Sequence, residues 1–479
     1  MQANNLLLIM SDEHDPRYMG ASGHPVVKTP CLDRLAERGI CFTNAYTPSP
    51  ICVPARASFA TGRYTYENRY WDNAMGYDGK MPGWGHRLQE VGNRVEAIGK
   101  LHYRKKEDPL GFDHQINPMH LHDGIGQVWG SIRDPLPESR GPRMFNKIGP
   151  GVSNYNIYDR QSANEACKWL KQHEKEKHWM LYVGLAAPHF PLVVPREYLD
   201  LYPEDCLPPR KLHPRDGYQH HPWIQAQEHF MAQENLFADD EERQLARRAY
   251  YGLCTFMDSQ IGLILDALED YGLADSTRVI YTSDHGDNLG ARGLWGKSNL
   301  YEESTKIPMI IAGPQVPRGQ SCKTPVSLVD CYPTILQGVG ISLQEEEQKL
   351  PGKSLFELMN EPENSERVVL SEYHAVGSIS GAFMLRKGRF KYHYYVGLPP
   401  ELFDLENDPE ETVDLAKDDG YASVLKMLEK ELRQHLDPEA VDAKAKADQD
   451  KLIKKFGGRK KALRMGAMGA TPAPGQESE

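Results

Sequence analysis

The sequence predicts a large α/β domain in which a mixed, mostly parallel sheet is sandwiched by helices. Two patterns predict this class. The first is a set of short apolar runs without polar alternation, which is typical of strands buried on both faces; the runs are 5–10, 179–185, 278–283 and 307–312. The second is the presence of amphipathic segments between these runs, because strands that alternate with helices build a doubly wound sheet.

Polar clusters follow three of the predicted strands. Asp12 and Glu13 come after the first run, His189 after the second, and Asp284 and His285 after the third. Open α/β sheets carry their sites at the carboxyl ends of the strands. We therefore expect the functional site at this edge of the sheet.

The first helix and its neighbours have clear local signals. A helix is predicted over 29–39, with Thr29 at the N-cap and Gly39 at its end. A strand is predicted over 40–46, and a second helix over 57–61, after Pro54.

The middle of the chain carries the strongest helical patterns. Residues 156–173 and 240–270 have apolar positions at helical spacing, and the second segment opens with acidic residues that suit a helix N-terminus. Residues 191–238 are rich in Pro and His and predict a long irregular excursion between these two helices.

The pattern changes near residue 350, and we predict a smaller C-terminal subdomain there. Short strands separated by hairpin-like breaks indicate an antiparallel sheet; they are 367–373, 381–386 and 390–395. Residues 440–465 predict a basic helix, and 466–479 have the Gly, Pro and Ser content of a disordered tail. The predicted division is a catalytic domain over 1–350, an antiparallel sheet with a helix over 351–435, and the basic helix with its tail over 436–479.

Composition excludes several classes of protein. The chain has 479 residues, of which 40% are hydrophobic and 26% charged, as expected for a soluble globular protein. A formal net charge of -11 argues against a nucleic-acid partner, because phosphate contacts need a basic face. No apolar run is long enough for a bilayer, and the N-terminus has no basic region before its apolar run, so we expect a cytoplasmic protein without a membrane partner.

The eight cysteines show no CxxC spacing, so a zinc knuckle or a thioredoxin-like site is not expected. In a cytoplasmic chain most cysteines are small buried apolar residues. We predict this structural role for seven of the eight, and a different role for Cys52.

Cys52 begins the segment Cys52-Val-Pro-Ala-Arg56, which is followed by Thr61-Gly62-Arg63. This segment resembles the C-x-P-x-R motif of the sulfatase family, within the alkaline phosphatase superfamily and closest to its choline-sulfatase-like and arylsulfatase branch. The resemblance implies an alkaline-phosphatase-like fold and hydrolysis of a small sulfate monoester. It also implies that a separate formylglycine-generating or other sulfatase-maturing enzyme oxidises Cys52 to formylglycine.

The chemistry explains why a plain thiol would not serve. A thiol that attacked sulfur would leave a stable adduct, whereas an aldehyde hydrate attacks through one oxygen and then expels sulfate when its second hydroxyl reforms the carbonyl. A helix N-terminus at residue 52 would favour the anionic substrate. Arg56, one turn later, can hold the hydrate and offset its charge.

The resemblance further implies a bound divalent metal ion, and the residues expected at it are Asp12, Glu13, Cys52, Asp284 and His285. Many sulfatases have an all-oxygen shell suited to calcium, which is our first candidate. His285 departs from that shell, and an imidazole donor tilts the preference towards manganese or another transition metal. Magnesium is a further alternative.

Four more segments resemble the sulfate-binding parts of the family. Lys100 and His102 lie in Gly99-Lys-Leu-His-Tyr103, and the resemblance implies that Lys100 neutralises a sulfate oxygen while His102 moves a proton. His189 would contact the sulfate or the leaving-group oxygen, and Lys297 would bridge the ester oxygen and the sulfate. Asn73 occupies a position where related choline-sulfatase-like and phosphonate-hydrolase sequences carry Asn.

Two other functions remain open from the sequence. A phosphonate monoester or phosphodiester hydrolase of the same superfamily would share much of the site, but resemblance to that branch would imply hydroxyl side chains in place of the Lys100-x-His102 pair. A binding protein on an inactive sulfatase scaffold should have lost some of these residues, and none is missing.

The leaving group is not readable from the sequence. A choline cage would need converging aromatic rings, for which Trp71, Tyr103, Trp129 and Trp223 are candidates that could equally be core residues. His220 and His221 fit either a cleft rim or a solvated loop. The basic stretch 444–464 is a candidate contact of a homo-oligomer or a solvated helix.

Overall fold

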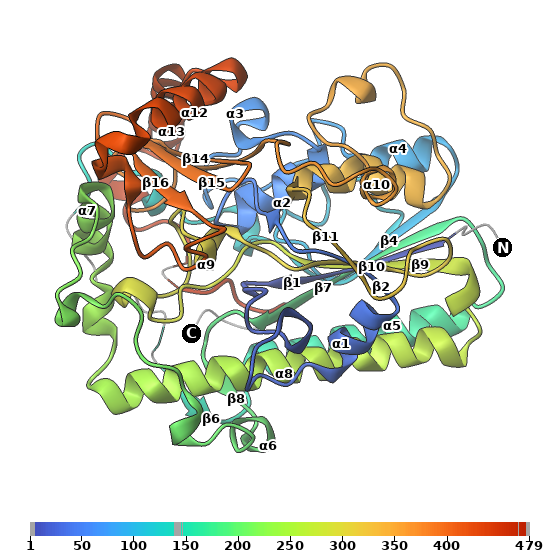
Figure 1. Cartoon of the computed structure of the whole chain (residues 1–479). Helices are drawn as coiled ribbons and strands as arrows, with labels where there is room; N and C mark the ends of the chain where they lie inside the picture. Colours follow the sequence, from blue (N-terminus) through green and yellow to red (C-terminus); the bar gives the residue numbers. More distant parts are fainter. Residues whose placement is uncertain (1–4, 138–144, 146, 468, 476–479) are drawn as a thin grey trace.

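The computed structural model describes residues 5–137, 145, 147–467 and 469–475. Its centre is an eight-stranded sheet (Figure 1). The strands, in spatial order, are β11 (Gln320–Cys322), β2 (Gly39–Phe42), β10 (Met309–Ala312), β9 (Thr277–Ser283), β1 (Asn5–Asp12), β7 (Trp179–Pro188), β4 (Arg94–Lys100) and β5 (His114–Met119). β1 runs parallel to both neighbours, β7 and β9, whereas β10 runs antiparallel to β9 and β2. The predicted mixed, mostly parallel sheet is confirmed.

Helices cover both faces of this sheet (Figure 1). One layer contains α1 (Pro30–Glu37), α5 (Asn154–Gln172) and α8 (Asp240–Asp270), and the other contains α2 (Cys52–Thr61), α4 (Trp84–Glu90) and α10 (Cys331–Gly338). Because both faces of β1 are covered, its sequence does not alternate between polar and apolar residues. Leu7 and Ile9 enter the core under the first layer, and Leu6, Leu8 and Met10 enter the core under the second.

A second, four-stranded antiparallel sheet follows. It contains β13 (Val369–Tyr373), β14 (Ala382–Lys387), β15 (Phe390–Tyr395) and β16 (Glu401–Asp404). Leu428 and Leu432 of α12 (Ala422–His435) pack on one face of this sheet. α13 (Pro438–Lys455) comes next and covers only the first part of the helix predicted over 440–465, which is interrupted at Gly457 and Gly458, where φ is positive. The predicted antiparallel C-terminal unit is present, and its exact domain boundaries remain a prediction.

The remaining elements are short. They are the strand pairs β3 (Ala45–Tyr46) with β12 (Val326–Ser327) and β6 (Gly149–Pro150) with β8 (Val193–Val194), and the helices α3 (Thr65–Asn68), α6 (Arg196–Leu199), α7 (Pro222–Met231), α9 (Glu302–Thr305), α11 (Leu355–Leu358) and α14 (Arg459–Ala462). Among the described residues, none of the helices combines the length and apolar character needed to span a membrane.

Several elements differ from the prediction. α2 starts at Cys52 rather than after Pro54, because a proline in the first turn costs no helical hydrogen bond. Segment 40–46 is divided into β2 and β3, which belong to different sheets. Segment 191–238 is less irregular than expected, since it contains α7 and buries Trp223 completely.

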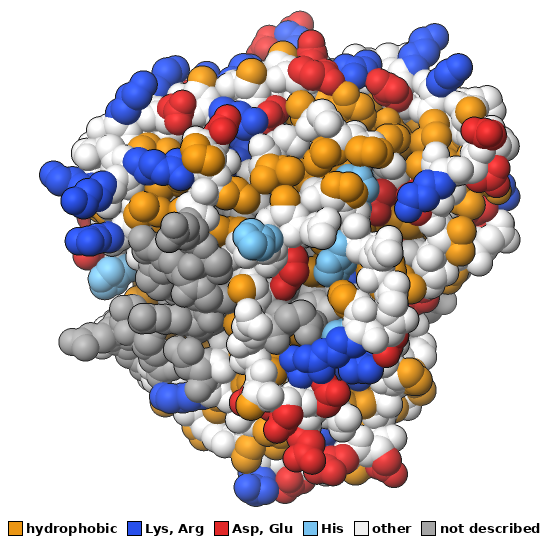
Figure 2. Space-filling model, turned by 90° about the vertical axis from the view of Figure 1, so that its left-hand side faces the viewer, with side chains coloured by type: hydrophobic (Ala, Val, Ile, Leu, Met, Phe, Trp, Pro, Cys, Tyr) orange, Lys and Arg blue, Asp and Glu red, His pale blue; other side chains and the backbone are white. Residues whose placement is uncertain are grey.

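The C-terminal residues also differ from the predicted disorder. Where the structure describes them, residues 466–475 return to the end of the sheet at which β1 stops (Figure 1). Ala473 is buried against Met119 and Tyr155. Small side chains allow this close packing, and composition alone does not reveal it. The face seen in Figure 2 carries acidic and basic side chains intermixed with hydrophobic ones.

Candidate active site

The ends of two neighbouring parallel strands bring the predicted carboxylates together. Ser11 of β1 lies opposite Ser283 of β9 in the register of the sheet. Asp12 and Asp284, one residue later in each strand, therefore reach the same point, and both are completely buried.

Cys52 is the first residue of α2 and is only 1% exposed. Its Sγ atom lies 3.7 Å from Oδ1 of Asp12 and 3.2 Å from Nε2 of His285. Burial, reinforced by the charge of Asp12, raises the pKa of the Cys52 thiol. An unmodified Cys52 would therefore stay protonated and be a poor nucleophile.

Arg56, one helical turn after Cys52, joins the two carboxylates. Its Nη2 donates to Oδ2 of Asp12 at 3.0 Å, and its Nε donates to Oδ2 of Asp284 at 2.8 Å. Because Arg56 takes the Oδ2 atom of each carboxylate, Oδ1 of Asp12 faces Cys52, and Oδ1 of Asp284 lies 3.6 Å from Nε2 of His285. Tyr182 helps to hold the guanidinium, since its hydroxyl accepts from Nη1 at 3.0 Å.

Four donor atoms converge at this point and fit a divalent cation. The atoms belong to Asp12, Cys52, Asp284 and His285 and lie within 4.8 Å of one another. His285 Nδ1 contacts the carbonyl of Gly286 at 3.0 Å, which leaves Nε2 directed at the group, as is usual for a metal-binding histidine. Burial lowers the pKa of His285 to about 4, so the ring is neutral and able to ligate.

Glu13 stands apart from these four donors. Its backbone has a φ of 69°, and its carboxylate turns towards Lys297 Nζ, 2.9 Å away, and His189 Nε2, 3.3 Å away. Its Oε1 atom is buried without a hydrogen-bond partner among the described residues. Glu13 instead forms a second possible donor group with Asp12 and His189.

Two lysines supply positive charge beside Cys52. Lys100 Nζ lies 2.8 Å from Oδ2 of Asp12, and Lys297 pairs with Glu13. Burial lowers the pKa of each lysine, but nearby acidic groups outweigh it: Asp12 raises the pKa of Lys100, and Cys52 and Glu13 raise that of Lys297. Both lysines therefore stay charged and can receive an anion.

The two predicted histidines are buried and neutral. Burial and the charge of Lys100 lower the pKa of His102, and burial with Lys297 does the same for His189. His102 Nε2 lies 2.8 Å from the hydroxyl of Thr471, and His189 Nδ1 lies 2.6 Å from the carbonyl of Phe190.

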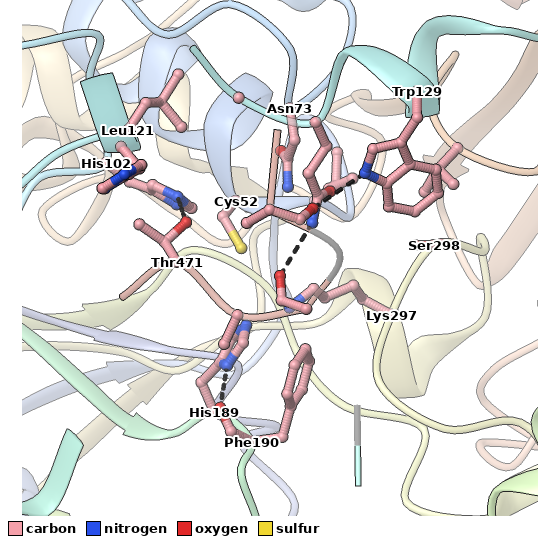
Figure 3. Close-up of a pocket in the computed structure, with 18 of the residues that line it drawn as sticks. Cys52, Asn73, His102, Leu121, Trp129, His189, Phe190, Lys297, Ser298 and Thr471 are labelled. Carbon is pink, nitrogen blue, oxygen red and sulfur yellow. Dashed lines mark hydrogen bonds between the residues drawn. The ribbon is translucent and has the colours of Figure 1, made fainter. Parts of the chain in front are cut away.

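These side chains line one cavity of about 110 Å³ (Figure 3). Its walls include the predicted residues Cys52, Asn73, Lys100, His102, His189 and Lys297. Asn73 has an additional role, because its Oδ1 accepts from the backbone N–H of Val53 and so satisfies the start of α2. Aromatic rings form much of the remaining wall, namely Trp129, Phe190, Phe230 and Trp295.

Sequence reasoning missed several residues at this site. Tyr182 and Tyr155 lie on a strand and a helix whose apolar patterns gave no sign of a polar role, although Lys100 Nζ sits 5.5 Å from the Tyr155 ring centroid. Thr471 lies in a segment predicted to be disordered. Its small neighbours Gly469, Ala470 and Pro472 carried no signal that could have identified it.

Other candidates are placed away from the cavity. Trp71 and Trp223 pack in the C-terminal cores, and Tyr103 packs in the core under α2. Of the four candidate aromatic residues, Trp129 lines the cavity. His220 and His221 contact the carbonyls of Arg292 and Pro399 and are not among the lining residues. All eight cysteines, each within the described part of the chain, are free of disulfide bonds.

Comparison with known proteins decides the family. The model of the family described as Sulfatase matches residues 4–341, which is more than half of the chain. The chain belongs to the sulfatase family. A second model, described as N-sulphoglucosamine sulphohydrolase, C-terminal, matches residues 290–437 of this sulfatase. The family resemblance and the enzyme class expected from the Cys52 motif, a sulfuric ester hydrolase, are confirmed.

Curated relatives of this sulfatase align along most of its length. Choline-sulfatase from Rhizobium meliloti (strain 1021) is 32% identical over 470 residues, covering 93% of this chain and 89% of the relative. Arylsulfatase K from Homo sapiens is 30% identical over 449 residues, covering 87% of this chain and 79% of the relative.

Solved structures share the fold of this sulfatase. Phosphonate monoester hydrolase of Agrobacterium radiobacter matches with a TM-score of 0.72 at 24% identity, covering 93% of this chain and 96% of that protein. A structure solved with its substrate D-glucosamine-2-N,6-O-disulfate matches with a TM-score of 0.72 at 22% identity, covering 94% and 99%.

Proposed function

We propose that this sulfatase hydrolyses a small sulfate monoester to an alcohol and sulfate, with formylglycine derived from Cys52 as nucleophile and a bound divalent metal ion. One observation carries the proposal. Residue 52 lies at the N-terminus of α2, against Asp12 and His285 on one side and within a cavity that also holds Lys100 and Lys297 (Figure 3). Residue 52 thus borders both the group of metal donors and the cavity that holds the anion-binding cations.

The metal would be held by Asp12, Asp284, His285 and the matured residue 52. When bound, it supplies positive charge that lowers the pKa of the hydrate and polarises the sulfate. Calcium remains the first candidate, and manganese and magnesium are alternatives; the imidazole of His285 favours manganese. The position of Glu13, turned towards Lys297, argues against a place for it among the ligands.

The other residues act on charge and protons. Arg56 holds Asp12 and Asp284 in position, so that the matured side chain meets a fixed carboxylate pair. Lys100 and Lys297 would bind the sulfate oxygens and the leaving-group oxygen.

His102 would take the proton from the hydrate, and His189 would serve the leaving group. Burial lowers the pKa of both imidazoles, so His102 is neutral, as a proton acceptor must be, and His189 would contact the leaving-group oxygen. Asn73 lines the same cavity and would contact the substrate there.

A phosphonate monoester or phosphodiester hydrolase is the alternative. A monoanionic phosphonate ester offers the same shape and charge to Lys100 and Lys297, and the fold is shared with phosphonate monoester hydrolase. Lys100 and His102 both line the cavity, which favours sulfate. Rates on an aryl sulfate and on phenyl phosphonate, measured with one preparation, discriminate the two functions.

The decisive experiment is mass spectrometry of the peptide that contains residue 52, after co-expression with a sulfatase-maturing enzyme. We expect the mass change of thiol to aldehyde at Cys52. Cys52→Ala should abolish turnover of an aryl sulfate, whereas Cys167→Ala, at a half-buried thiol of α5, should leave it intact. An unmodified Cys52 in an active enzyme, or equal loss in both variants, would contradict the proposal. A cytoplasmic location stays a prediction that fractionation can test.

A further inference from the structure

The C-terminal segment 466–475 lies outside both matched family models, which end at residues 341 and 437. It nevertheless forms one wall of the cavity that contains Cys52. Ala467, Gly469, Ala470 and Thr471 all line this cavity. The segment is therefore part of the site by position, although the family comparison assigns it no role.

Side chains from the body of the protein hold the backbone of this segment. Trp129 Nε1 donates to the carbonyl of Ala467 at 3.0 Å, and Gln127 Nε2 donates to that of Gly469 at 3.2 Å. The Tyr155 hydroxyl donates to the carbonyl of Thr471 at 2.6 Å. Three successive anchors of this kind fix the path of the segment across the cavity.

Gly466 marks the entry of the segment into the site. Its φ is +89°, and a Cβ atom there would lie 1.9 Å from the carbonyl oxygen of Gly126. Both the backbone conformation and the close approach require glycine. The chain therefore turns into the cavity at a position that tolerates no side chain.

The helix before the segment is fixed as well. In α13, Gln449 Nε2 donates to Oδ2 of Asp72 at 2.8 Å, and Asp442 accepts from buried Arg133 at 2.8 Å. Asp72 is the neighbour of Asn73 in the cavity wall. The C-terminal part is thus anchored at two places around the same site.

Thr471 makes a polar side-chain contact between the segment and a predicted catalytic group. Its hydroxyl lies 2.8 Å from Nε2 of His102 (Figure 3). Nδ1 of the same ring is buried and has no hydrogen-bond partner among the described residues. The orientation of His102 within the cavity therefore depends on the Thr471 contact.

We propose that residues 466, 467 and 469–471 form the leaving-group wall of the active site, with Thr471 as the positioning residue of His102, so that this wall selects small sulfate esters. The proposal rests on the proposed function. Pockets for drug-sized ligands usually measure about 300 Å³ or more, whereas this cavity, bounded by the segment and by apolar rings, has about 110 Å³. Displacing the segment would open the cavity to bulkier leaving groups.

The first test uses full-length Gly466→Ala, which should displace the segment, and Gly475→Ala as its control. Gly475 also has a positive φ, but a Cβ atom there would meet nothing within 4 Å. We expect the kcat/KM ratio of methylumbelliferyl sulfate over para-nitrophenyl sulfate to rise roughly tenfold in Gly466→Ala only. A Gly466→Ala variant with a mobile segment and the wild-type ratio would overturn the selectivity role.

Hydrogen exchange of residues 469–475 separates this proposal from the proposed function, because it needs no turnover. The amides should be protected in the wild type and in Gly475→Ala, and exposed in Gly466→Ala. Unprotected amides in the wild type would contradict the proposal that this segment forms a wall of the site, even if the enzyme hydrolyses sulfate esters. Protected amides in a chain without sulfatase activity would instead contradict the proposed function.

The second test concerns Thr471. Thr471→Val should lower kcat by roughly 10- to 100-fold with little change in KM and should shift the pH profile of kcat, whereas Thr471→Ser should restore both. A Thr471→Ser variant as slow as Thr471→Val, or a Thr471→Val variant with wild-type kcat, would overturn the positioning role.

Discussion

Arg56 is the residue on which charge compensation at the site depends most. It is 1% exposed and is bonded to Asp12 and Asp284, which are completely buried. Burial would raise the pKa of Asp12, but Lys100 and Arg56 outweigh it and hold the pKa well below its usual value. Asp12 therefore stays ionised at neutral pH.

Removing the guanidinium should destabilise the protein strongly. In Arg56→Ala, buried Asp284 loses its cation, and we expect the free energy of unfolding to fall by about 3–5 kcal/mol. Arg34→Ala is the matched control, because Arg34 of α1 pairs with Asp266 of α8 at an exposed site. Its free energy of unfolding should change by no more than about 0.5 kcal/mol. Urea unfolding in metal-free buffer measures both, and equal losses would contradict this account of Arg56.

At the scale of elements, α5 fixes the turn that presents His189. Oδ1 and Oδ2 of Asp159 accept from the backbone N–H groups of Ala186 and Ala187, at 2.7 and 2.8 Å. Burial raises the pKa of Asp159 to about 7, although these two N–H groups partly oppose it. The end of β7 is thus held by a carboxyl group that titrates near neutral pH.

This carboxyl predicts a pH-dependent stability. The folded state keeps its proton up to about pH 7, whereas the unfolded chain releases it near 3.8. The stabilising contribution is therefore complete below pH 3.8 and is lost as the pH rises through 7. Asp159→Asn should remove this loss, so the wild type should become less stable relative to the variant as the pH rises. Urea unfolding at a series of pH values tests it, and a constant difference would count against the assignment.

At the scale of the whole molecule, buried ion pairs join the small antiparallel sheet to the catalytic part. Lys391 of β15 is completely buried, and its Nζ lies 2.9 Å from Glu302 of α9 and 2.8 Å from Glu411. Glu302 lies on the catalytic side of this junction, where its Oε2 accepts from the hydroxyl of Tyr46 in β3 at 3.4 Å and pairs with Lys306. The small sheet is therefore bound to the catalytic part by charges that cannot be hydrated.

We expect the whole chain to unfold in one cooperative transition because of this junction. Lys391→Met should lower the free energy of unfolding by about 3–5 kcal/mol, because the buried carboxylates of Glu302 and Glu411 would both lose their ion pair with the Lys391 ammonium. Lys387→Met, which removes the more exposed pair with Glu431, should cost less than about 1 kcal/mol. Calorimetry and circular dichroism report both effects, and a Lys391→Met variant as stable as Lys387→Met would refute the junction.

The sequence by itself determined the fold class and the residues that meet at Cys52. Buried strands such as β1 are visible as unbroken apolar runs, and the helix over 240–270 was predicted with its observed bounds. These signals are local, because hydrophobic periodicity and helix caps act over a few residues. The carboxylate of Asp12 and the Asp284-His285 pair were expected to meet because the ends of neighbouring parallel strands share one edge.

Only the tertiary structure decided which contacts the neighbouring side chains of the site make. Glu13 follows Asp12 directly, yet its left-handed backbone turns it towards Lys297. Asn73 supports the start of α2, and Thr471 reaches His102 from a segment whose composition predicts disorder. These placements depend on which distant surfaces pack together. That choice is made by the free energy of the whole chain and leaves no periodic signal in a short stretch of sequence.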